Sequence, residues 1–156
     1  LSLDTNLPEI TPKNTSNSVL SSIQAVREQF RKEYIQSFVS LKGICQRWGL
    51  PISKGVMNKN KVEELVSESK KIPQEVKDWL LELLQSCREL QKRLNKISKY
   101  LKEYADNDEI CQKIMSVPGI GPITATRLKA TIGDIQRFEK PKSIVAYYGL
   151  VSCNFN

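Results

Sequence analysis

The sequence predicts an all-α protein: a long helix plus a coiled-coil helix, followed by a helix-hairpin-helix domain that is truncated at the C-terminus. Three observations lead to this fold class. Apolar residues recur three or four positions apart over residues 18–48, and the same spacing becomes a strict heptad pattern over 76–104. A Gly-x-Gly-Pro sequence at 119–122 then marks a tight turn between two further helices.

These observations divide the chain into four parts. Residues 1–17 contain two prolines and no periodic pattern, which indicates a linker or tail. A helical region at 18–73, a coiled coil at 74–105 and an incomplete helix-hairpin-helix domain at 106–156 follow. The first residue is Leu1 where a translated chain would begin with methionine, so we expect a fragment of a longer protein.

The first predicted helix is amphipathic and ends at Gly49, with Pro51 just beyond it. Its expected apolar stripe consists of Val19, Ile23, Val26, Phe30, Tyr34, Phe38, Leu41, Ile44 and Trp48. A basic loop follows, and Asn60 with Glu63 forms a predicted capping box for a short helix to about Ser69. The lysines around this helix either contact a phosphate backbone or face solvent, and their sequence pattern is the same in both cases.

The coiled-coil seam is the clearest structural signal. Apolar residues alternate spacings of four and three without a miss, which gives a 3.5-residue period. Such a stripe needs a partner, either the helix at 18–48 folded back antiparallel or the same helix of a second subunit. The seam comprises Val76, Leu80, Leu83, Cys87, Leu90, Leu94, Ile97, Leu101 and Tyr104.

The hairpin follows acidic residues at 106–109 that suit the first turn of a helix. Pro122 is favoured at a first helical position, and the two glycines leave the backbone bare, so amide groups there can converge on a phosphate oxygen. Ile114, Val117, Ile120, Ile123 and Leu128 are expected to pack the two helices together, with Arg127 and Lys129 on the polar side. A plain packed turn is the alternative reading of the same pattern.

Composition favours an acidic partner. Lys and Arg outnumber Asp and Glu by 24 to 17, which favours nucleic acid, although solvated helix faces also carry such lysines. Histidine is absent, so the usual general base and imidazole metal ligands are excluded. The four cysteines form no Cys-x-x-Cys pair, which indicates buried free thiols. With neither a signal peptide nor a membrane span in the sequence, we expect a cytoplasmic protein that does not bind membrane.

The predicted DNA-binding residues lie in and after the hairpin, and no catalytic or metal-binding residue is assigned. The backbone amides at 119–124 would hold a phosphate, while cationic side chains add charge that positions DNA without reading its sequence. The set is Gly119, Ile120, Gly121, Thr124, Arg127, Lys129, Arg137, Lys140 and Lys142.

A family resemblance rests on three segments in order: Val117-Pro118-Gly119-Ile120-Gly121-Pro122, Gly133-Asp134-Ile135-x-x-Phe138 and Ala146-Tyr147-Tyr148-Gly149-Leu150-Val151. Together they resemble the C-terminal domain of the DEDD transposases of the IS110 insertion-sequence family, the Piv-like recombinases. The coiled coil and the stretch from Leu41 to Ile52 are also similar to that family. The resemblance is specific from about 75 to 151, looser from 18 to 74 and absent before that.

The resemblance implies a longer enzyme that cuts and rejoins DNA at insertion-element ends and targets. It implies an N-terminal RuvC-like domain whose carboxylates bind Mg²⁺, a catalytic serine in the C-terminal domain, and a guide RNA. This chain lacks the RuvC-like half, which Asp4 and Glu9 do not replace, and the serine falls at or past its end. Ser152 takes the place of a family proline and is not assigned catalysis.

We therefore expect the DNA-binding part of an insertion-sequence transposase that needs no cofactor of its own, is inactive alone in strand exchange and forms a homo-oligomer through the coiled coil. The alternative is a non-catalytic helix-hairpin-helix coiled-coil protein that binds DNA in repair or architecture. A purely structural coiled-coil protein is a third, weaker possibility.

Overall fold

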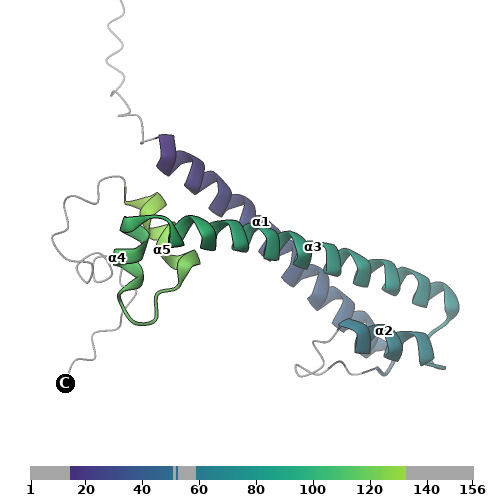
Figure 1. Cartoon of the computed structure of the whole chain (residues 1–156). Helices are drawn as coiled ribbons and strands as arrows, with labels where there is room; N and C mark the ends of the chain where they lie inside the picture. Colours follow the sequence, from purple (N-terminus) through teal and green to yellow (C-terminus); the bar gives the residue numbers. More distant parts are fainter. Residues whose placement is uncertain (1–14, 51, 53–58, 133–156) are drawn as a thin grey trace, which may run out of the picture. The chain divides into compact units, whose positions relative to one another are not determined.

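The computed structural model describes residues 15–50, 52 and 59–132, and all regular structure in them is helical (Figure 1). The helices are α1 (Thr15–Arg47), α2 (Lys59–Glu68), α3 (Gln74–Asp106), α4 (Glu109–Met115) and α5 (Pro122–Thr131). The all-α prediction is confirmed. The described residues form two compact units, one with residues 15–24 and 101–132 and the other with residues 25–100.

Helix α1 ends as the sequence predicts. Gly49 has a φ of 71°, in the left-handed region that favours glycine, and the N–H of Leu50 donates to the carbonyl oxygen of Cys45 at 2.9 Å. The Gly49 N–H donates to Gln46 at 3.0 Å, which completes a Schellman motif. The chain is thereby turned out of the helix toward α2.

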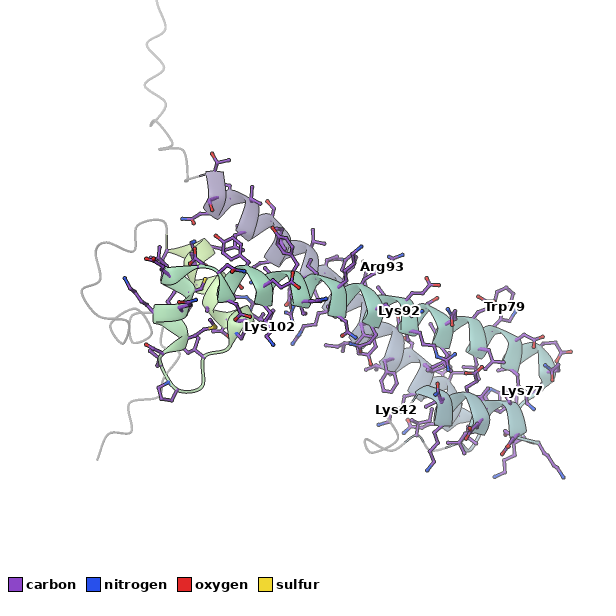
Figure 2. All side chains as sticks on the ribbon, viewed as in Figure 1. Lys42, Lys77, Trp79, Lys92, Arg93 and Lys102 are labelled. Carbon is purple, nitrogen blue, oxygen red and sulfur yellow. The ribbon has the colours of Figure 1, made fainter. Side chains whose placement is uncertain are left out.

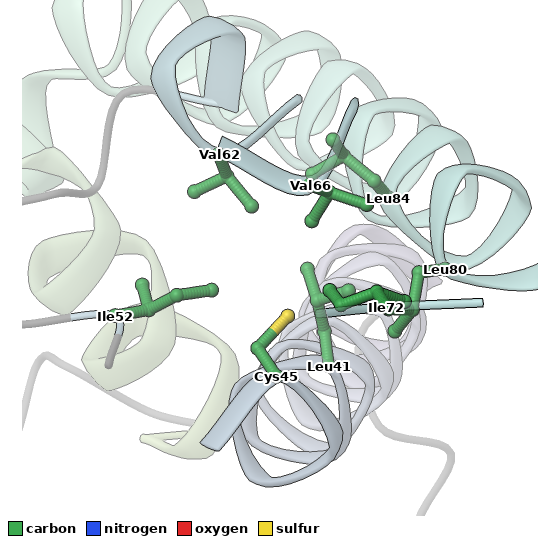
Figure 3. Packing of buried hydrophobic residues seen from close by; sticks show 8 residues of the cluster. All are labelled: Leu41, Cys45, Ile52, Val62, Val66, Ile72, Leu80 and Leu84. Carbon is green, nitrogen blue, oxygen red and sulfur yellow. The ribbon is translucent and has the colours of Figure 1, made fainter. Parts of the chain in front are cut away.

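The core of the 25–100 unit lies where α1, α2 and α3 meet (Figure 3). Its fully buried residues are Leu41, Cys45, Ile52, Val62, Val66, Ile72, Leu80 and Leu84. Outside this core, Arg88 of α3 forms an ion pair with Glu63 of α2. The predicted capping box is wrong, because Asn60 lies inside α2 and Glu63 is engaged by Arg88.

The heptad seam of α3 is covered by α1 of the same chain. In the 25–100 unit, Arg27 donates to the hydroxyl of Ser98 at 3.1 Å, and Leu41 shares a core with Leu80. Residue numbers therefore rise along α1 where they fall along α3, so the two helices run antiparallel. Every predicted seam position of α3 is buried or half-buried. Of the two predicted partners, the folded-back helix is the one found, and a homo-oligomer stays a prediction.

The predicted apolar stripe of α1 is wrong at three positions. Val19, Val26 and Trp48 are 51%, 46% and 37% exposed, whereas Asn17, Leu20 and Gln24 are buried. The buried positions keep a heptad spacing through Tyr34, Phe38, Leu41 and Cys45, but the stripe includes polar residues near its start. The spacing of apolar residues predicts the neighbouring face of the helix, because it does not count a polar residue whose amide is buried with hydrogen-bond partners.

Candidate nucleic-acid interface

The hairpin is formed by α4 and α5, and each helix begins with the residue its sequence predicts. Asp108 has extended backbone and its side chain accepts a hydrogen bond from the Cys111 N–H at 2.9 Å, so it is the N-cap of α4. Pro122 is the first residue of α5, and Gly121 is its N-cap. These two features set the directions of the helices that flank the turn.

Of the apolar residues predicted to join the two helices, Ile114, Ile120 and Leu128 do so, whereas Ile123 packs with Leu20, Leu101 and Ala130. Ile114, Val117, Ala125 and Leu128 are buried, while Ile120 and Ile123 are half-buried. Small Ala125 is fully buried in the cluster that joins α4 and α5, together with Ala105 from the end of α3. The hairpin is therefore held on one side by a continuous apolar contact.

The two hairpin glycines have different physical roles. Gly119 has a φ of 88°, which an L-residue with a Cβ rarely adopts. Gly121 has φ −94° and ψ 177°, which is ordinary extended backbone open to any residue. A Cβ on Gly121 would meet no heavy atom beyond its chain neighbours within 4 Å. Neither conformation nor crowding in the described part of the chain requires glycine at 121, so its bare backbone faces open space.

The amide groups of the turn are partly engaged. The Ile120 N–H donates to the Val117 carbonyl at 3.2 Å, and the Ala125 N–H donates to the Gly121 carbonyl at 2.9 Å. Pro122 has no N–H, and Gly121 has no side chain to cap the first turn. The amides of Ile123 and Thr124 thus stand at the positive end of α5 without a capping side chain. That arrangement suits an anionic oxygen.

Lys129 does not lie on an exposed polar side, and the prediction that placed it there is wrong. It is only 8% exposed, and its ammonium forms an ion pair with the Asp108 carboxylate. It also donates to the Tyr104 hydroxyl at 2.9 Å and lies 5.0 Å from the centre of that ring. Arg127 is exposed on α5. The ion pair ties the end of α5 to the N-cap of α4 and to α3.

The pKa values in this cluster follow from burial and hydrogen bonding. Burial alone would raise the pKa of Asp108, but hydrogen bonds from Lys129 and the Cys111 amide outweigh it and leave the pKa below its usual value. Burial would lower the pKa of Lys129, but its bonds to Asp108 and Tyr104 raise it overall. Burial, reinforced by the negative charge of Asp108, raises the pKa of the Cys111 thiol to about 12. The thiol is therefore protonated and inert at neutral pH.

Gln24 of α1 contacts the hairpin, and no pattern in the sequence indicates this contact. Its amide nitrogen donates to the Thr126 hydroxyl at 2.7 Å and to the Ile123 carbonyl at 3.2 Å. Thr126 in turn donates to the Pro122 carbonyl at 2.8 Å. Because the Ile123 carbonyl can only accept, this contact fixes which end of the Gln24 amide faces α5. Gln24 therefore positions the first turn of α5.

The other predicted site residues divide into two groups. Thr124 is half-buried in the first turn of α5. Arg137, Lys140 and Lys142 lie outside the described residues, as do Ser152 and Cys153. The described cysteines, Cys45, Cys87 and Cys111, are buried free thiols as predicted. Over residues 15–50, 52 and 59–132, no three Cys, Asp or Glu side chains gather in a way that would hold a metal ion.

Comparison with known proteins finds relatives of this chain among transposases. The chain is 25% identical over 142 residues to the transposase for insertion sequence element IS1328 of Yersinia enterocolitica, covering 91% of this chain and 42% of that protein. Residues 111–156, which include the hairpin, match the model of the transposase IS116/IS110/IS902 family. Over these residues the chain is similar to the transposase IS116/IS110/IS902 family.

Two other relatives of this chain are also named as transposases. It is 27% identical over 143 residues to the transposase for insertion sequence element IS1111A of Coxiella burnetii, covering 89% of this chain and 39% of that protein. It is 24% identical over 142 residues to a probable family 20 transposase of Pseudomonas aeruginosa, covering 89% and 42%. The chain thus spans about two-fifths of the length of these relatives. No solved structure matches it.

None of the helices in the described part of the chain combines the length and apolar character needed to span a bilayer.

Proposed function

We propose that this chain holds DNA for an insertion-sequence transposase and that the α4–α5 hairpin binds the phosphate backbone. The observation that carries the proposal is Gly121. Among the described residues, neither the backbone conformation nor crowding requires a glycine there, and the missing side chain leaves room for a partner to approach the backbone. The matching family model covers this turn, which connects it with transposition.

The phosphate would lie at the N-terminus of α5. The Ile123 and Thr124 amides supply donors, and the helix dipole stabilises the negative charge. The exposed Arg127 lies on the same helix and can pair with an adjacent phosphate. We leave Lys129 out of this contact, because reaching DNA would leave the Asp108 carboxylate unpaired and partly buried. In this proposal Lys129 stabilises the fold and does not contact DNA.

Strand cleavage and rejoining, with Mg²⁺, belong in this proposal to the whole transposase. The chain spans about two-fifths of its relatives, which are named as transposases for insertion sequence elements. Mg²⁺ and a guide RNA enter only through the family resemblance. The contribution we assign to this chain is to hold DNA, by contacts that position it without reading its sequence.

Duplex DNA binding over a series of salt concentrations tests the hairpin. The Gly121→Val variant is expected to fold like the wild type, because a Cβ at this position meets no heavy atom of the described residues within 4 Å beyond its chain neighbours, and to lose most of its affinity. Arg127→Gln is expected to reduce the slope of log K against log salt by about 0.9, the value for one lost phosphate contact. Lys113→Gln, a cation of α4 that is also exposed, is the matched control. Unchanged binding by Gly121→Val would refute the proposed hairpin contact.

A further inference from the structure

The first turns of α1, residues 15–24, belong to the same compact unit as the hairpin, and we call them the α1 strap. Figure 2 draws the side chains of these turns on the ribbon of α1. The strap consists largely of Ser, Thr, Asn and β-branched residues, which are weak helix formers. The stretch that follows, Ala25 to Tyr34, is instead rich in Ala, Arg, Glu, Gln and Lys. The helix of the strap therefore depends strongly on its tertiary contacts.

The apolar contacts of the strap are few. Leu20 is its only buried apolar side chain and packs with Leu101 and Ala130, while Ile23 is half-buried beside them. The contact between α4 and α5 is made by a larger buried cluster, and none of the described residues of that cluster belongs to the strap. The strap is therefore held more weakly against the unit than the hairpin helices are held to each other.

Gln24, the last residue of the strap, holds two successive carbonyl groups in the first turn of α5. Its amide nitrogen donates to the Ile123 carbonyl at 3.2 Å and to the Thr126 hydroxyl oxygen at 2.7 Å. The Thr126 hydroxyl donates its own proton to the Pro122 carbonyl at 2.8 Å. The Ile123 carbonyl is thus held directly, and the Pro122 carbonyl is held through Thr126.

The two carbonyl groups belong to the peptide units that carry the proposed phosphate donors. The Ile123 carbonyl shares its unit with the Thr124 N–H, and the Pro122 carbonyl shares its unit with the Ile123 N–H. A peptide unit is planar, so the direction of its carbonyl fixes the direction of its N–H. Holding both carbonyls therefore aims both amides at the N-terminal end of α5.

We infer that Gln24 is a positioning residue for the phosphate contact and that docking of the α1 strap sets how tightly the hairpin binds DNA. This inference rests on the proposed function of the hairpin. The Gln24 Oε1 atom is buried without a donor among the described residues, and this cost offsets part of the gain from the two donated bonds. The strap therefore docks weakly and opens locally. Because phosphate favours the aimed amides, DNA binding and strap docking stabilise each other.

Gln24→Met tests the positioning role, because Met has a similar volume and donates no hydrogen bond. Binding to a duplex DNA of random sequence is measured over a series of salt concentrations, at a temperature where circular dichroism shows every variant to be folded. The affinity is expected to fall about three- to tenfold at each salt concentration with an unchanged slope, because no charged contact is lost. Adding Gln24→Met to Gly121→Val should have no further effect, because DNA no longer reaches the amides that Gln24 aims.

Ser21→Ala combined with Ser22→Ala tests the docking of the strap. Both side chains are exposed, so the double variant raises helix propensity and leaves the contacts with α5 in place. It is expected to tighten DNA binding by up to about fivefold. Ser40→Ala combined with Ser86→Ala, at exposed helical positions of the 25–100 unit, is the matched control and should leave the affinity unchanged.

Wild-type affinity in Gln24→Met would overturn the positioning role, and an unchanged affinity in the Ser21 and Ser22 variant would overturn the role of docking. If Gly121→Val lowers the affinity and Gln24→Met does not, the hairpin proposal stands and this inference fails. If Gly121→Val binds DNA like the wild type, the hairpin proposal and this inference fail together.

Discussion

The ion pair between Lys129 and Asp108 makes a prediction that reverses the expected role of Lys129. The side chains are 11% and 21% exposed, so the pair lies between a surface salt bridge and a fully buried one. Hydrogen bonds to charged groups contribute about 1.5–3 kcal/mol. Because Lys129 also donates to the Tyr104 hydroxyl, we expect Lys129→Met to lower the free energy of unfolding by about 2–3 kcal/mol.

A double-mutant cycle measures this interaction by urea denaturation. Asp108→Asn removes the charge but keeps a good N-cap residue for α4, so its cost reports mainly the lost ion pair. The double variant removes both charges and should be more stable than the sum of the single effects predicts, by about 1–2 kcal/mol. Strict additivity, or a destabilisation by Lys129→Met below about 0.5 kcal/mol, would refute the structural role. Lys113→Met, at an exposed position of α4, is the control and should change stability by less than about 0.5 kcal/mol.

Four further predictions follow from the same structure. The pKa of Asp108 is lowered on folding, so its contribution to stability is present above its ordinary value of 3.8 and is lost as pH falls through the folded value; the stability gap between wild type and Asp108→Asn should therefore narrow in acid denaturation below about pH 4. Gly119→Ala should cost about 1–2 kcal/mol in thermal denaturation because of its positive φ, whereas Gly121→Ala should cost less, about 0.5–1 kcal/mol, because only the N-cap preference for glycine over alanine is lost. Gln24→Leu should cost about 1–3 kcal/mol, because it removes both amide contacts to α5, and faster hydrogen exchange in α5 would locate the effect. Leu84→Ala should cost about 2–5 kcal/mol in urea denaturation, because Leu84 is 1% exposed in the core of α1, α2 and α3.

The elements themselves could be predicted from local chemistry. Heptad spacing predicts the seam of α3, Asp108 and Pro122 mark the starts of helices, and Gly49 marks the end of a helix. Each of these signals depends on a few neighbouring residues. Periodicity, capping and the φ preference of glycine act within about two turns, so they can be recognised without knowing what the helix packs against.

The contacts that complete the candidate site depend on residues far apart in the chain. Gln24 contacts Thr126, and Lys129 contacts Tyr104 and Asp108. A sequence pattern classifies Gln and Lys as solvent-facing, because burying either one costs free energy unless partners are present. Those partners are brought together only by the fold, so the buried face of α1 and the role of Lys129 could not be read from spacing.

The sequence by itself determined the all-α class, the α3 seam and the glycine turn between α4 and α5, because these follow from local periodicity and backbone preferences. Only the tertiary structure decided that α1 of the same chain covers the seam, that Gly121 faces open space and that Lys129 is held by Asp108. The physical reason is that these outcomes depend on which groups pair and which remain uncovered when distant segments pack, and local preferences carry no information about that pairing.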